Sequence, residues 1–168
     1  INIIRGDVTM EWGGDVIVTL DENGREDIKG VVNVPIVDDR LGVKLFGAQI
    51  KSDGFVYNTT LNEDVGGDDV QNYGFAAKWQ PTDQFDIKLH YEKTKDESDQ
   101  GAYVNRNVGT DFTCAIFQQC VTNTGDNENQ NSSNTRNFSD NEYDTTILTA
   151  NYDFGNMVLT YIGAKRDM

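Results

Sequence analysis

The chain has 168 residues, with 28 Asp and Glu against 14 Lys and Arg, which gives a formal net charge of −14 at pH 7. This charge excludes a protein that binds nucleic acid electrostatically, because such a protein needs a basic surface. The mean hydropathy of −0.58 is that of an ordinary soluble protein, and no run reaches the roughly 18 apolar residues of a membrane helix. Membrane β-strands, whose apolar and polar residues alternate, give the same averages.

The sequence predicts seven strands and no sustained helix, because apolar residues recur at every second position. In chain order, the predicted strands are 16–20, 28–36, 41–45, 72–79, 85–92, 145–152 and 157–161. The clearest is 85–92, whose apolar and charged faces are formed by Phe85, Ile87, Leu89 and Tyr91 and by Asp86, Lys88, His90 and Glu92. The fold class predicted is therefore all-β.

The connections between the predicted strands alternate in length. The turns at 37–40, 80–84 and 153–156 are tight, whereas the loops at 52–71 and 93–143 are long and polar, and 21–27 is a hairpin with Asn23-Gly24 at its tip. Outer-membrane barrels have short periplasmic turns and long outer loops, and soluble barrels and sandwiches lack this asymmetry. The pattern predicts an antiparallel up-and-down transmembrane β-barrel.

Aromatic residues collect beside the tight turns. Trp12, Trp79, Phe85, Tyr152 and Phe154 all lie at or near strand ends of this kind. An aromatic girdle at a membrane interface predicts this placement. The alternative is the general enrichment of aromatic residues in strands.

Two cysteines, Cys114 and Cys120, lie in the longer loop, and the only histidine, His90, is distant from them in sequence. This spacing does not suit zinc. A small disulfide loop formed in an oxidising compartment is the preferred interpretation, and two free thiols are the alternative.

The acidic segments 62–69 and 126–128 offer carboxylates that could bind Ca²⁺, but their spacing does not match an EF-hand. Solvated loop charge is the preferred interpretation, so no metal and no cofactor is predicted. This acidity disfavours anionic ligands unless Arg106 or Arg136 balances it. A lone histidine among acids on a strand is no catalytic set, so no enzyme is expected and no catalytic residue is assigned.

Several ordered motifs resemble those of TonB-dependent outer-membrane receptors. Segments 24–48 and 51–58 resemble the first barrel strands of that family, and 78–86 and 149–160 resemble its later periplasmic turns. Segment 111–120 is similar to a disulfide-bearing outer loop of some members, and 1–4 looks like the last strand of the plug domain. The resemblance implies that residues 1–10 end the plug and that 11–168 form about seven strands of a larger barrel, with outer loops at 52–71 and 93–143.

Receptors of this family carry an upstream plug with a TonB-contacting segment and a barrel of 22 strands. Residues 5–8 lack the proline that many relatives have there, and Met168 is not the aromatic residue that commonly ends these barrels. The chain is therefore expected to be a piece of a longer receptor.

The resemblance implies uptake of a scarce nutrient complex, such as a siderophore, across the bacterial outer membrane with energy relayed by TonB. The implied partners are the rest of the barrel and plug, the TonB complex, outer-membrane lipid and a small-molecule ligand that the sequence does not identify. Lumen-facing positions would be Asp86, Lys88, His90 and Glu92, together with Lys44 and Lys78. Their ordinary role there is solvation and salt bridging.

Two other classes fit the same pattern. The first is a complete small eight-stranded outer-membrane barrel with a structural or adhesive role, which requires its first and last strands to pair. The second is a soluble all-β assembly module, which requires no detergent for solubility.

Overall fold

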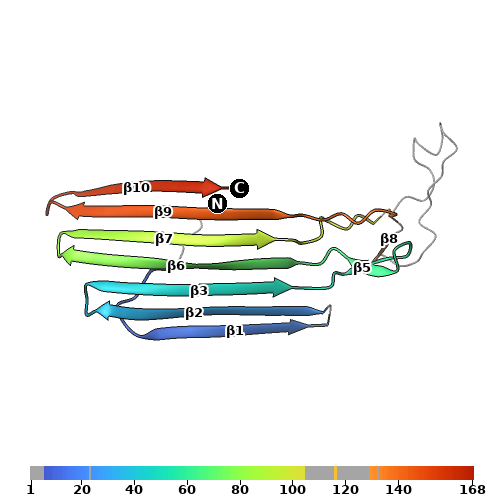
Figure 1. Cartoon of the computed structure of the whole chain (residues 1–168), viewed down its shortest axis with the longest axis horizontal. Helices are drawn as coiled ribbons and strands as arrows, with labels where there is room; N and C mark the ends of the chain where they lie inside the picture. Colours follow the sequence, from blue (N-terminus) through green and yellow to red (C-terminus); the bar gives the residue numbers. More distant parts are fainter. Residues whose placement is uncertain (1–5, 23, 105–115, 117–128, 132) are drawn as a thin grey trace.

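The computed structural model describes residues 6–22, 24–104, 116, 129–131 and 133–168. Ten strands within these ranges form two sheets. The large sheet contains β1 (Gly13–Asp21), β2 (Arg25–Val37), β3 (Leu41–Lys51), β6 (Asp69–Thr82), β7 (Phe85–Asp96), β9 (Asn141–Asp153) and β10 (Val158–Asp167) in that order, all antiparallel (Figure 1). The small sheet contains β4 (Val56–Asn58), β5 (Glu63–Val65) and β8 (Gln130–Asn131). Each of the seven predicted strands matches one strand of the large sheet, which confirms the all-β antiparallel prediction.

The predicted alternation of turn lengths is also confirmed. The β2–β3, β6–β7 and β9–β10 turns lie together at one end of the large sheet, here called the short-turn end (Figure 1). Asp39 and Gly155 provide positive φ angles of 53° and 88° in two of these turns. Gly155 is the residue type that tolerates this conformation best, because it has no Cβ. The β1–β2 turn and the long connections lie at the opposite end, here called the long-loop end (Figure 1).

The strands extend further toward the long-loop end than the sequence predicts. The predicted loops were 52–71 and 93–143, whereas β6 begins at Asp69, β7 ends at Asp96 and β9 begins at Asn141. Asp69 pairs with Lys51, and Asp96 pairs with Asn141. Backbone ladder bonds do not require apolar side chains, so pairing continues beyond the last apolar residue.

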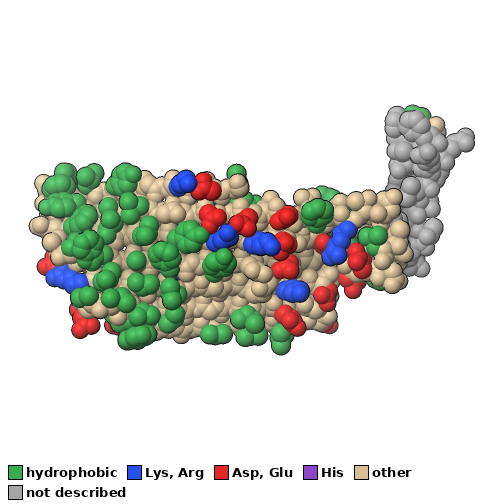
Figure 2. All heavy atoms as spheres, viewed as in Figure 1, with side chains coloured by type: hydrophobic (Ala, Val, Ile, Leu, Met, Phe, Trp, Pro, Cys, Tyr) green, Lys and Arg blue, Asp and Glu red, His purple; other side chains and the backbone are tan. Residues whose placement is uncertain are grey.

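One face of the large sheet, here called the apolar face, carries hydrophobic side chains from neighbouring strands. The register places Val32 opposite Leu45, Leu45 opposite Phe75, and Leu89 opposite Leu148. These side chains are not covered by other parts of the described chain, and Leu45 in the middle of the sheet is 47% exposed. In Figure 2 hydrophobic side chains gather toward the short-turn end, and charged ones gather nearer the long-loop end. So broad an exposed apolar surface indicates an interaction partner or a lipid environment.

The opposite face, here called the polar face, carries the alternate residues. Lys44 lies opposite Asn33 and Lys88 opposite Thr149 in the register. The two edges of the sheet are β1 and β10, which do not pair with each other among the described strands. The closure that a complete eight-stranded barrel requires is therefore not seen in the part of the chain that the structure describes. Among these residues there is also no helix long and apolar enough to cross a membrane.

The aromatic residues lie where the sequence predicts. The rings of Phe85 and Tyr152 face each other across β7 and β9 with centroids 6.4 Å apart, and Tyr152 contacts Phe154 at 4.6 Å. Trp12, just before β1, and Trp79, near the end of β6, are also exposed at the short-turn end of the sheet. These contacts favour an amphipathic boundary at the short-turn end.

Candidate functional site

The described parts of the two long loops fold together into one unit at the long-loop end. This unit, here called the cap, consists of residues 52–68 and 97–104 and the described part of 129–140. Within it β4 pairs with β5 in antiparallel and with β8 in parallel orientation. Val56 and Val65 are buried between these strands. The second loop is too polar to build a core of its own, and its described strand β8 pairs with β4 of the first loop.

Asn58 joins the two loops. Its side chain is buried, and its Oδ1 accepts hydrogen bonds from the backbone N–H groups of Thr60 (2.9 Å) and Leu61 (3.0 Å). Its Nδ2 donates to the carbonyl of Ser133 at 3.0 Å. These three bonds give the buried Asn58 amide the hydrogen-bond partners that water would otherwise provide. Asn58 therefore fixes both the turn after β4 and the position of the second loop.

An ion pair between Arg136 and Asp99 also connects the loops. Arg136 Nε donates to Asp99 Oδ1 at 3.0 Å, and its Nη1 lies 3.7 Å from Glu63 Oε2. The Asp99 side chain is only 7% exposed, whereas that of Arg136 is 54% exposed. Asp99 Oδ2 accepts a further bond from the N–H of Gly66. The hydrogen bond to Asp99 is the main reason that the pKa of Arg136 lies above its usual value.

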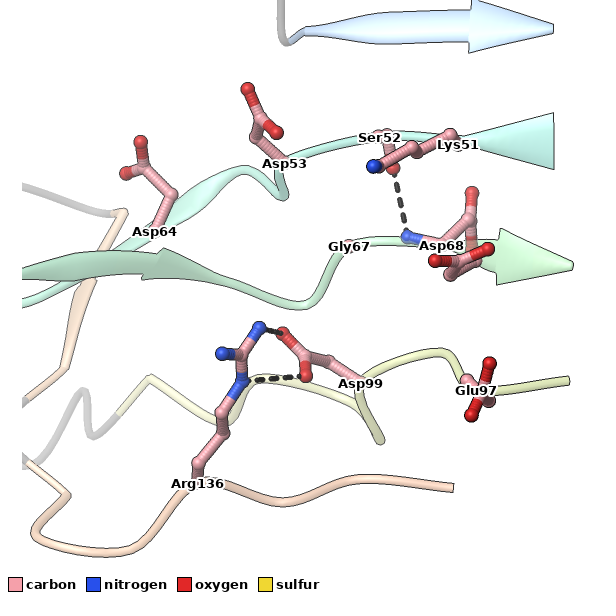
Figure 3. Close-up of a pocket in the computed structure, with 10 residues that line it drawn as sticks. Lys51, Ser52, Asp53, Asp64, Gly67, Asp68, Glu97, Asp99 and Arg136 are labelled. Atoms are coloured by element: carbon pink, nitrogen blue, oxygen red, sulfur yellow. Dashed lines mark hydrogen bonds and ion pairs between the residues drawn. The ribbon is translucent and has the colours of Figure 1, made fainter. Parts of the chain in front are cut away.

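A cavity of about 360 Å³ opens between the loops beside this ion pair (Figure 3). Its lining includes six carboxylates and two cations, namely Asp53, Asp64, Asp68, Asp69, Glu97, Asp99, Lys51 and Arg136. Arg136 points toward Asp99 in Figure 3, so its charge is already engaged. The cavity therefore presents a negative field that disfavours anionic ligands, as the sequence suggested. Of the two arginines named there, Arg106 lies outside the described residues.

A second cavity of about 310 Å³ adjoins the first one and shares Asp53 and Asp64 with it. Its lining differs in kind, because Phe55 and Tyr57 contribute aromatic surface. Both rings are exposed. Aromatic side chains beside polar groups are typical of small-molecule sites.

Asp27 holds Arg25, which connects β2 to the cap through a contact that the sequence did not indicate. The Asp27 side chain is buried, and its Oδ2 accepts from Arg25 Nη2 at 3.1 Å and lies 3.6 Å from Lys29 Nζ. Arg25 Nη1 also donates to Asp68 Oδ2 in the cap at 3.2 Å. The sequence could have indicated the contacts within β2, because residues at i, i+2 and i+4 of a strand, here Arg25, Asp27 and Lys29, lie on one face.

The four predicted lumen-facing residues of β7 all lie on the polar face. Asp86 accepts a hydrogen bond from Asn151 Nδ2 at 2.9 Å. The His90 ring stacks on Phe46 with centroids 5.4 Å apart, and its Nε2 lies 3.1 Å from Glu92 Oε2. Because the described strands enclose no lumen, a lumen-facing role for Asp86, Lys88, His90 and Glu92 stays a prediction.

The segment 6–12 crosses the polar face near the short-turn end. Val8 is 5% exposed and packs against β3 at Gly42, where a Cβ would lie 3.2 Å from Val8 Cγ1. The backbone N–H of Thr9 donates to Asn33 Oδ1. Lys88 Nζ lies 2.7 Å from the Asp7 carboxylate. The large sheet therefore holds this segment by both packing and charge.

The predicted disulfide is not tested by the described residues. Within the described ranges no cluster of three or more His, Cys, Asp or Glu side chains is placed to bind a metal ion. Cys114 and Cys120 lie outside the described residues, as does the acidic segment 126–128.

No protein-family model and no curated protein matches this sequence. Among solved structures, the chain is similar to the crystal structure of the siderophore receptor PirA from Acinetobacter baumannii, with a TM-score of 0.62 and 20% sequence identity. The match covers 98% of this chain and 23% of the receptor chain. Almost the whole chain thus shares the fold of about a quarter of a siderophore receptor.

Proposed function

We propose that this chain is part of an outer-membrane receptor that takes up a scarce nutrient complex, such as a ferric siderophore, with energy relayed by TonB. The observation that carries the proposal is the likeness of almost the whole chain to one part of a siderophore receptor. The two ends of the sheet support it, because one has tight turns and the other has a folded cap with cavities.

In this proposal the apolar face contacts lipid and the polar face lines the lumen. Strands of 9 to 14 residues in the large sheet are long enough to cross a bilayer, since about 9–11 residues suffice for a tilted strand. The aromatic residues at the short-turn end then lie at the periplasmic interface. Lys44, Lys78, Asp86, Lys88, His90 and Glu92 then face water or the plug.

Unpaired strand edges are not tolerated in hydrocarbon. The edges at β1 and β10 therefore call for further strands of the same barrel as neighbours. We assign residues 1–10 to the end of the plug and 11–168 to the barrel. TonB then acts through plug sequence outside this chain.

The cap is the proposed ligand-contacting part. Its acidic cavity argues against a strongly anionic ligand, and the adjoining cavity offers Phe55 and Tyr57 for apolar or stacking contacts. We also propose that Cys114 and Cys120 form a disulfide in the second loop. Peptide mapping under non-reducing conditions tests this bond, and two alkylatable thiols would exclude it.

Uptake of radioactive iron by the source bacterium tests the proposed function. Deleting the gene should abolish uptake of one ferric siderophore from a panel, and the full-length gene should restore it only in a strain with intact TonB. Replacing Phe55 and Tyr57 by alanine should lower uptake, whereas Tyr103→Ala, at a cap position that is 83% exposed and lines neither of these cavities, should not.

Cell fractionation together with the uptake assay can contradict the proposed function. Recovery of the protein in the soluble fraction without detergent would favour the assembly module. Recovery in the outer membrane together with unchanged uptake of every ferric siderophore tested would refute siderophore transport.

A further inference from the structure

Three lysines on the polar face converge on the start of the segment 6–12. Lys88 Nζ lies 2.7 Å from Asp7 Oδ1, and Lys78 Nζ lies 3.6 Å from Asp7 Oδ2. Lys44 Nζ donates a hydrogen bond to the carbonyl of Gly6. The lysines belong to three adjacent strands, β3, β6 and β7. Their ammonium groups thus surround one carboxylate and the carbonyl beside it.

The sheet register forces two of these cations together. Lys78 lies directly opposite Lys88 in the β6–β7 pair, and like charges in that relation repel each other. Asp7 is the carboxylate that both of them reach. Asp86, two residues before Lys88 on the same face, accepts its hydrogen bond from Asn151 instead. Among the described ion pairs of Lys78 and Lys88, Asp7 is the shared carboxylate, and Lys44 donates to a carbonyl, so the three ammonium groups can accept more anionic charge.

The Asp7 carboxylate is accessible to a competing ion. Its side chain is 53% exposed, and that of Lys88 is 36% exposed. A soluble anion can therefore approach the ammonium groups without disturbing the strands. The segment is also held by the buried Val8 side chain, by Met10 against β3 at Gly42, and by the hydrogen bond from Thr9 to Asn33.

We propose that Lys44, Lys78 and Lys88 form a binding site for a phosphate-like oxyanion, and that Asp7 occupies this site as an intramolecular ligand. An oxyanion with several charged oxygens can accept hydrogen bonds from all three ammonium groups, which one carboxylate held on a chain segment does not do here. Such an anion displaces Asp7 and releases residues 6–12 from the polar face. This inference stands independently of the transported ligand.

Thiol labelling of Val8→Cys in the full-length protein tests the proposal, because Val8 is buried while the segment is bound. A maleimide reacts at position 8 only after release, and the tryptic peptide 6–25 contains no native cysteine. Inorganic phosphate is added at constant ionic strength, with chloride as the balancing anion. Saturating phosphate should raise the labelling rate about tenfold, the scale expected for exchange of charge-assisted hydrogen bonds.

Matched variants separate specific binding from screening. Lys78→Gln combined with Lys88→Gln should label rapidly without phosphate and show no phosphate response. Glu11→Gln removes a charge from the same segment away from these lysines and should behave like the parent. Asp7→Asn should bind phosphate more tightly by calorimetry, because the internal competitor is gone.

Three results would overturn the proposal. They are equal labelling in chloride and phosphate, a phosphate response that survives in the double lysine variant, and no gain in phosphate affinity in Asp7→Asn. Heat-modifiable electrophoretic mobility of each variant confirms that the strands have assembled before labelling is compared.

Discussion

Replacing Arg136 by glutamine tests whether an ion pair holds the two loops of the cap together. The substitution leaves the Asp99 carboxylate, which is 7% exposed, without its strongest partner. Breaking a fully buried pair costs about 3–5 kcal/mol. Arg136 itself is 54% exposed, and exposed pairs contribute only about 0–1 kcal/mol. An intermediate loss of about 2 kcal/mol in local cap stability follows for this half-buried pair.

Hydrogen exchange of the backbone amides measures this loss. The amides of Gly66 and Asp99 donate within the cap, so they exchange only when the loops separate. A loss of about 2 kcal/mol should speed their exchange by about 30-fold. The pKa of Arg136 lies above its usual value. The stabilisation that the Arg136–Asp99 pair provides is therefore fully present below the ordinary arginine pKa and is lost only at more alkaline pH. The difference between parent and variant should therefore be equal at about pH 6 and pH 9.

Lys95→Gln is the matched control. Lys95 pairs with Glu97 at 2.8 Å, but both side chains are well exposed, and such pairs stabilise little. Its removal should leave the exchange of Gly66 and Asp99 unchanged. Equal acceleration in both variants, or no acceleration in Arg136→Gln, would refute the role assigned to burial of Asp99.

Three further substitutions test the sheet and the cap. Val32→Lys places a charge on the apolar face and should reduce the amount of assembled protein, because a lysine that meets lipid costs about 2–4 kcal/mol of stability. Val31→Lys on the polar face should be tolerated. Heat-modifiable electrophoretic mobility compares the two variants. Gly74→Ala places a Cβ against the backbone carbonyl of Tyr91 in β7 and should destabilise the protein by about 1–3 kcal/mol. Gly47→Ala is the control, because its Cβ meets only ordinary contacts at 3.8 Å. Urea unfolding measures both changes. Asn58→Ala removes three buried hydrogen bonds and should speed cap hydrogen exchange at least tenfold, at about 1–3 kcal/mol; unchanged exchange would contradict the role of this side chain.

The sequence predicted the large sheet well because its strands are patterned locally. The alternation around Leu89 and the turn residues around Gly155 are readable without knowledge of any partner. The strand ends were missed because Asp69 and Asp96 interrupt the apolar alternation but not the backbone ladder.

The cap and the lysine site depend on contacts between distant parts of the chain. Val56 and Val65 show no period of their own, and they become a core only when β8 joins them. Lys78 and Lys88 were expected on one face, but nothing local indicates that Asp7 lies between them, because that contact joins residues 81 positions apart. Composition did indicate the acidic character of the cap, although it did not indicate which carboxylate Arg136 engages.

The parallel pairing of β4 with β8 has a consequence for the order of folding. Each neighbouring pair in the large sheet is antiparallel and follows the chain, so hairpins can form one after another. The cap contacts of Asn58 and Thr59, by contrast, reach across 75 and 72 residues. Forming such contacts costs the conformational entropy of closing the intervening chain, and this cost falls once β6, β7 and β9 have brought the loops together. We therefore expect the cap to close last, onto strands that are already in register.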